Sequence, residues 1–221
     1  MSEIKYTRPA DIERASMEII RTELAARGLA VAPENEAVVL RAIHATADFD
    51  YAQNMVFTPH AVQKGIAALK AGADIITDTN MAKTGISKPA LARLGGEVYC
   101  CMAEERVADA ARAEGVTRAA ASMRIAAREH PGAVFAVGNA PTALLELCAL
   151  IEQDFRPALV IGVPVGFVNV AESKELMRSV CRQYHLPAII AMGRKGGSSV
   201  AAAVCNALLY AATDTLDPGR R

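Results

Sequence analysis

The stretch AVFAVGNAPTA, residues 133–143, decides the fold of this chain. It consists of a short continuous apolar run, a polar turn, and a proline at a place where a helix can begin. A strand that is apolar on both faces is typical of a parallel sheet covered by helices on both sides. Proline suits the first turn of a helix, because the N–H that it lacks would have no partner there. We interpret the stretch as a strand that leads into a helix.

Four further apolar runs repeat this pattern, each ending in Gly, Pro, Asp or Asn and followed by a segment with helical periodicity. They are ADIITDT (73–79), EVYCCM (97–102), ALVIGVP (158–164) and PAIIAMG (187–193). Helical periodicity also covers residues 8–28, 33–47 and 59–72. Alternating strands and helices predict an α/β fold, here a three-layer α/β/α sandwich with a mainly parallel sheet of about five strands. We expect residues 1–221 to form a single domain.

Composition and charge exclude several classes of protein. The formal net charge is zero, so we expect neither nucleic acid nor an anionic membrane surface as a partner. The start of the chain has no apolar signal-peptide core, and no run approaches the roughly 18 apolar residues of a membrane span. We therefore expect a soluble, cytoplasmic protein. Its 5 cysteines, most within apolar runs, are interpreted as reduced thiols.

The sequence predicts no metal bound by the protein, and it carries no motif for a nucleotide. No two histidines have metal-ligand spacing and no CxxC is present. The loop GRKGGSS (193–199) does not match the P-loop pattern, and VGNAPTA (137–143) does not match GxGxxG. A nucleotide-using enzyme is therefore the weakest of the functional alternatives.

The loops after the predicted strands are the place to look for a binding site, because ligands of open parallel sheets bind outside the carboxyl ends of the strands. These loops read TDTNMAKTGISK, VGNAPTA, GVPVGFVNVAESKE and GRKGGSS. They offer short polar side chains, cations and helix-start amides that can hold carboxylates. The alternative is that they are tight turns with solvated cations. The candidate ligand contacts are Asp78, Thr79, Asn80, Asn139, Ala140, Thr142, Lys174, Arg194, Lys195, Gly196, Gly197 and Ser198.

The helix-like stretch AIHATADFDY (42–51) supplies the candidate catalytic group. On a helix, Arg41, His44 and Asp48 fall at i, i+3 and i+7 and share one face. An imidazole titrates near neutral pH, so His44 could donate a proton to a ligand. The alternative is a core histidine bonded to a backbone carbonyl. We interpret the other histidines, His60, His130 and His185, as loop or capping residues.

Taken together, IHATADFDY, TDTNMAKTGI, AVGNAPTALLEL, GVPVGFVNVAESKE and GRKGGS resemble the precorrin-8X methylmutase family, which includes the cobalt-precorrin-8 methylmutases of corrin-ring biosynthesis. The resemblance runs through nearly the whole chain. It implies an isomerase that moves a methyl group from carbon 11 to carbon 12 of the macrocycle by a 1,5-sigmatropic shift, giving hydrogenobyrinate or cobyrinate. It also implies a homodimer of α/β sandwiches.

The resemblance assigns roles to three residues: His44 matches the family's catalytic histidine, and Ser16 and Arg41 match positions that contact substrate. A flat tetrapyrrole with many carboxylates needs dispersed anion-binding loops, and a pericyclic shift needs no metal or cofactor. We expect His44 to be the proton donor and acceptor, with Arg41 or Asp48 tuning its pKa. The main alternative is a non-catalytic corrinoid carrier. The sequence leaves open whether the substrate contains cobalt.

Overall fold

The structure, a computed structural model, describes residues 8–215. Residues 1–7, on which part of the localisation prediction rests, and residues 216–221 lie outside the described residues. One six-stranded sheet has the order β1-β6-β5-β4-β2-β3. Its strands are β1 (Met55–Phe57), β2 (Ile75–Thr77), β3 (Val98–Tyr99), β4 (Val134–Val137), β5 (Leu159–Gly162) and β6 (Ala188–Ala191).

All neighbouring strands are parallel except β1, which pairs antiparallel with β6. The helical elements are α1 (Pro9–Ala26), η1 (Pro33–Asn35), α2 (Glu36–Thr46), α3 (Tyr51–Asn54), α4 (Ala61–Lys70), α5 (Asn80–Gly85), α6 (Lys88–Arg93), α7 (Glu105–Glu114), α8 (Arg118–Glu129), α9 (Pro141–Glu152), α10 (Val170–Gln183) and α11 (Ser198–Ala212).

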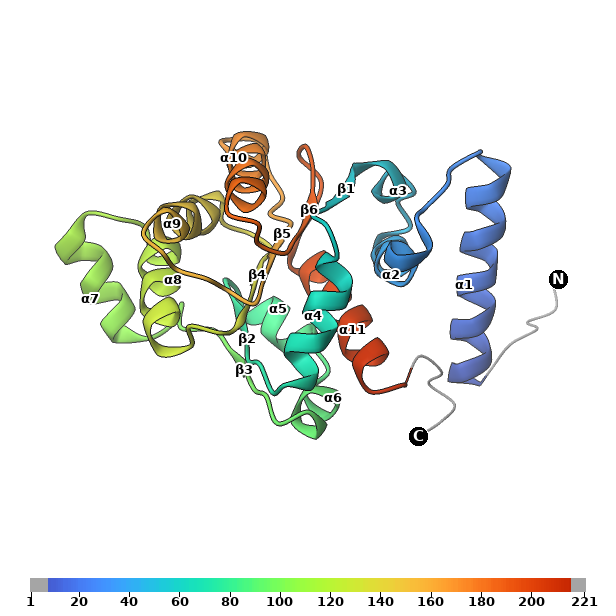
Figure 1. Cartoon of the computed structure of the whole chain (residues 1–221), viewed down its shortest axis with the longest axis horizontal. Helices are drawn as coiled ribbons and strands as arrows, with labels where there is room; N and C mark the ends of the chain where they lie inside the picture. Colours follow the sequence, from blue (N-terminus) through green and yellow to red (C-terminus); the bar gives the residue numbers. More distant parts are fainter. Residues whose placement is uncertain (1–7, 216–221) are drawn as a thin grey trace, which may run out of the picture.

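Two apolar clusters cover the two faces of the sheet, because successive side chains of a strand point to opposite faces. In β4, Val134 and Ala136 belong to the cluster formed with α2, α4 and α11. Phe135 and Val137 belong to the cluster formed with α8, α9 and α10. Figure 1 shows these helices on opposite sides of the strands. The arrangement confirms the predicted three-layer α/β/α sandwich.

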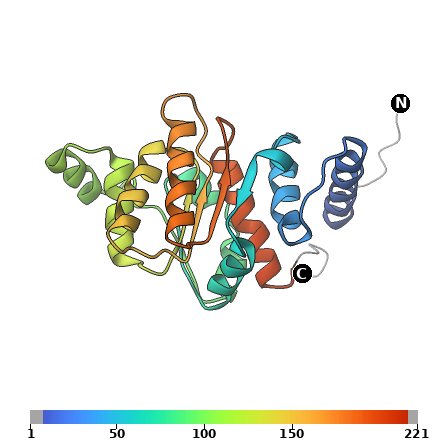
Figure 2. The same ribbon diagram turned by 45° about the horizontal axis from the view of Figure 1, so that its top comes forward.

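Two helices lie at the far ends of the molecule. Helix α1 packs against α2, and α7 packs against α8. Figures 1 and 2 both place α1 and α7 at opposite ends of the long axis. Within residues 8–215, no helix has both the length and the apolar composition that a membrane span requires.

The five predicted strands coincide with β2 to β6, and the structure adds a sixth that the sequence analysis missed. Strand β1 has only three residues, too few for the apolar pattern to stand out beside the helix that follows. This strand connects the segment that follows α2 to the edge of the sheet at β6. The predicted helix 33–47 is also shorter, since it begins with η1 and ends at Thr46.

Candidate functional site

Helices α1 and α2 bring two of the predicted contact residues together. Arg41, on α2, forms an ion pair with Glu13 of α1, with 2.6 Å between Nη2 and Oε1. Ser16 lies one turn after Glu13 on the same helix, and its hydroxyl donates to the backbone oxygen of Ile12. The Arg41 side chain is only 16% exposed. Its charge is therefore already matched within the protein.

His44 is exposed on the last turn of α2, and it forms no hydrogen bond or ion pair within the described residues. The alternative of a core histidine bonded to a carbonyl is wrong. The predicted stacking of Asp48 on the same helix face is also wrong, because α2 ends at Thr46 and Ala47 adopts a left-handed conformation with φ of 55°. Asp48 thus lies beyond the helix.

Lys195 connects the segment after α2 to the GRKGGSS loop. Its Nζ lies 2.7 Å from Asp48 Oδ2 and 2.5 Å from Asp50 Oδ2. These two carboxylates raise the pKa of Lys195 above its ordinary value, and the hydrogen bond from Lys195 lowers the pKa of Asp48. Both groups stay charged near neutral pH. The lysine predicted to bind a ligand carboxylate is thus engaged by two carboxylates of the chain itself.

All four predicted loops meet at the carboxyl ends of the parallel strands. The hydroxyls of Thr79 and Ser198 are 2.7 Å apart. A side-chain carbon at Gly138 would lie 2.8 Å from Ser198 Cα, so the loops after β4 and β6 are in contact. One at Gly196 would lie 2.1 Å from the Val163 oxygen, which makes glycine necessary there. Gly197 donates to the same Val163 oxygen at 2.8 Å.

The prediction that Asp78 faces the ligand is wrong. This residue is 1% exposed, and its carboxylate accepts the amides of Gly138, Asn139 and Ala140 at 2.7 to 2.8 Å. Burial raises the pKa of Asp78, and these three bonds lower it by less. The amides before α9, which we expected to bind a ligand carboxylate, instead bind Asp78.

Lys174 does not face a ligand at the carboxyl edge of the sheet either. This residue of α10 is fully buried, and its Nζ donates to the backbone oxygens of Gly193 and Lys195 at 2.8 Å each. Burial lowers its pKa to about 8. Because its ammonium group binds two backbone oxygens of the GRKGGSS loop, Lys174 stabilises this loop and is not available to a substrate carboxylate.

The remaining predicted contacts lie nearer the surface. Asn80, Asn139 and Arg194 are exposed, while the Thr142 hydroxyl accepts a hydrogen bond from Thr117 at 2.8 Å. Arg194 lies over the ring of Phe167, with 5.3 Å from its guanidinium carbon to the ring centroid.

The loop after β5 carries an exposed apolar segment that was not among the predicted ligand contacts. Phe167 is 79% exposed and Val168 is 77% exposed. The signal was present in GFVN, since apolar residues are unusual in a loop that faces water. An exposed imidazole, a guanidinium and an apolar loop at one edge of the sheet can bind a large ligand that has apolar faces and anionic groups. In residues 8–215, no cluster of three or more His, Cys, Asp or Glu could hold a metal ion.

Comparisons with known proteins all lead to one enzyme family. The family model for precorrin-8X methylmutase matches residues 11–211. Cobalt-precorrin-8 methylmutase of Priestia megaterium is 42% identical over 201 residues, covering 90% of this chain and 87% of the relative. Cobalt-precorrin-8 methylmutase of Salmonella typhimurium is 47% identical over 179 residues, covering 80% of this chain and 82% of the relative. The solved precorrin-8X methylmutase of Thermus thermophilus superposes with a TM-score of 0.82 at 40% identity, covering 92% of this chain and 96% of the other.

Proposed function

Since this chain belongs to the precorrin-8X methylmutase family and is an isomerase of cobalamin biosynthesis, we propose that it moves a methyl group from carbon 11 to carbon 12 of precorrin-8X or cobalt-precorrin-8. His44 is the proton donor and acceptor for this shift. The observation that carries the proposal is the exposed, unpartnered imidazole at the end of α2, beside the loops at the carboxyl edge of the sheet, within the described part of the chain.

In this reaction the protein needs to hold the macrocycle in one orientation and to supply one proton. A methyl group that shifts within a conjugated ring needs no nucleophile. Protonation of a ring nitrogen near the migrating group makes the receiving carbon more electrophilic, and holding the ring in one orientation favours the reactive geometry. Exposed Arg194 is suited to a peripheral carboxylate of the substrate, and Phe167 offers an apolar surface to the ring.

The pairing of Lys195 with Asp48 and Asp50 positions His44 in this proposal. It joins the segment that follows α2 to the GRKGGSS loop. The loop that contacts the substrate and the helix that carries the acid are therefore held together. Ser16 and Arg41 contact the substrate from the α1 side. The homodimer and the cytoplasmic location inferred from the sequence stay predictions.

We expect His44→Ala to lower the rate of isomerisation by roughly a hundredfold to ten-thousandfold, as is typical when a positioned acid or base is lost. Purified protein is incubated without oxygen with precorrin-8X and, separately, with cobalt-precorrin-8, and the absorption spectrum of the macrocycle is followed. The control is Ala37→Gln, an exposed position at the other end of α2, which should keep the wild-type rate.

Three outcomes separate the proposals. Turnover by the wild type that is lost in His44→Ala supports the isomerase with this acid. Turnover at the wild-type rate in His44→Ala removes His44 from the mechanism. A spectral change that stops at one equivalent would instead support the corrinoid carrier.

A further inference from the structure

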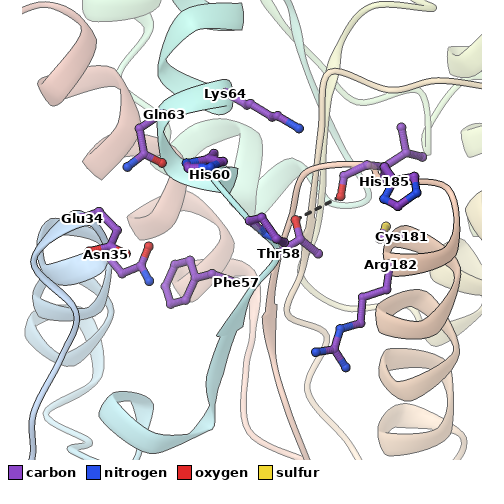
Figure 3. A pocket seen from close by; sticks show the side chains of 12 residues that line it. Glu34, Asn35, Phe57, Thr58, His60, Gln63, Lys64, Cys181, Arg182 and His185 are labelled. Atoms are coloured by element: carbon purple, nitrogen blue, oxygen red, sulfur yellow. Dashed lines mark hydrogen bonds between the residues drawn. The ribbon is translucent and has the colours of Figure 1, made fainter.

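A hollow lies away from His44, where strand β1 ends and strand β6 begins. Its volume is about 620 Å³, within the range of small-molecule sites. It opens between η1, the start of α4 and the end of α10 (Figure 3). Strand β1 starts beside the GRKGGSS loop and ends at this hollow, so the length of that strand separates the two sites.

One side of the hollow is basic. Lys64 comes from α4, Arg182 from the last turn of α10, and His185 from the turn before β6. His60, which precedes α4, lies next to Lys64 (Figure 3). Two permanent positive charges and two imidazoles thus line one hollow. Arginine and lysine in such a group are suited to a phosphate, since they can donate several charge-assisted hydrogen bonds to it.

The other side has a different chemistry. Figure 3 shows Glu34 and Asn35 of η1 across the hollow from Arg182, with Gln63 of α4 beside His60. We call Glu34, Asn35 and Gln63 the amide side. This amide side offers a carboxylate and two amides, which accept and donate hydrogen bonds.

The floor between the two sides is rigid and partly aromatic. Phe57 presents a half-buried ring. The Thr58 hydroxyl donates to the oxygen of Leu186 at 3.0 Å (Figure 3). It also accepts the amide of Ala188 at 2.8 Å. These bonds tie the end of β1 to β6, so the floor is preformed. An apolar floor with a few convergent polar groups is the usual construction of a small-molecule site.

The polar side chains of both sides are available to a ligand. Within residues 8–215, none of them forms a hydrogen bond or an ion pair, either with one another or with the rest of the chain. This differs from the carboxyl edge of the sheet, where Lys195 and Lys174 are both engaged by atoms of the chain.

We propose that this hollow is a second binding site, for a small organic phosphate with a flat, hydrogen-bonding end, of the size and chemistry of a nucleoside monophosphate. The phosphate lies among Lys64, Arg182 and His185. The flat end lies on Phe57, with its amino and ring N–H groups facing the amide side. A phosphate held by side chains needs no glycine-rich loop, so the lack of a P-loop motif is consistent with this site. Its test does not depend on the proposed methylmutase activity.

The test is isothermal titration of the full chain with adenosine, guanosine, cytidine and uridine monophosphates, and with adenosine and inorganic phosphate as partial probes. We expect saturable binding of at least one nucleotide, with both partial probes weaker. Lys64→Ala/Arg182→Ala should weaken nucleotide binding at least tenfold. The matched control is Lys70→Ala/Arg178→Ala, which removes the same two charges from α4 and α10 outside the hollow.

Several results would overturn the proposal. These are no saturable binding by any nucleotide, equal weakening by both double variants, or inorganic phosphate binding as tightly as the nucleotides. Displacement of the bound nucleotide by a corrinoid would place it at the carboxyl edge instead. All four substituted side chains are exposed or half-buried, and unchanged thermal melting of each variant verifies its fold.

Discussion

Two loops at the carboxyl edge of the sheet are each held by a buried charge, and the two charges have opposite signs. Asp78 accepts three backbone amides of the loop before α9. Lys174 donates to two backbone oxygens of the GRKGGSS loop. Backbone dipoles therefore fix both loops, and exposed side chains such as Asn139 and Arg194 stay free to face a ligand.

Asp78 and Lys174 are the anchors of these two loops. They differ in how well backbone groups compensate the cost of burying their charges. Asp78 meets three N–H groups at the start of α9, where the helix dipole is positive. Lys174 meets two carbonyl oxygens and no helix end. Burial raises the pKa of Asp78 in spite of its bonds, and it lowers the pKa of Lys174 to about 8. We infer that the carboxylate is the stronger anchor, because it has one more backbone partner and a favourable helix dipole.

The largest expected effect comes from Asp78→Asn. An amide oxygen can replace only part of the acceptor capacity of the carboxylate, so buried N–H groups lose their partners, while the cost of burying a charge is relieved. We expect the free energy of unfolding to fall by about 2–4 kcal/mol. Urea unfolding at pH 7 measures it. Asp109→Asn, an exposed aspartate on α7, is the control and should change stability by less than about 1 kcal/mol. Equal effects of the two variants would show that the loop amides do not depend on Asp78.

A smaller effect is expected from Lys174→Met, which keeps most of the length of the side chain and removes its charge. Two carbonyl oxygens lose a donor, but the buried charge is also removed, so we expect a loss of about 1–3 kcal/mol in the same experiment. The control is Lys88→Met, an exposed lysine. A variant as stable as the wild type, with unchanged substrate binding, would mean that Lys174 does not hold the loop.

The sequence predicts the place of these loops but not what holds them. Continuous apolar runs such as VFAV mark buried parallel strands, so β2 to β6 and the edge at which their loops gather are visible in it directly. The partners of Asp78 lie at least 60 residues away in the chain. Which side chain meets which amide depends on the strand order, and strand order leaves no local signal. In the sequence alone, a polar anchor after a strand therefore looks the same as a ligand contact.

The error at Asp48 has a local cause. Helix α2 ends through a left-handed alanine, where glycine is the usual signal. The helical pattern continues past the true end of α2 at Thr46, and extending it to residue 48 placed Asp48 on the face of His44. Its true partner, Lys195, comes from a loop almost 150 positions later, which no periodicity could indicate.

The smallest expected effect is a dependence of stability on pH that belongs to Lys174. Its pKa is about 8 in the folded chain and 10.5 without burial. Between these values the unfolded chain binds more protons, so the free energy of unfolding rises with pH in this window. We expect the wild type to gain about 1 kcal/mol relative to Lys174→Met between pH 8 and pH 9. Below about pH 7 the difference between the two should be constant. The free energy of unfolding of both proteins is measured in urea at each pH. In the difference between them, the contributions of the other titratable groups cancel. A difference that stays flat through pH 9 would mean that the carbonyl oxygens of Gly193 and Lys195 compensate the buried ammonium fully, and the two anchors would then be equivalent.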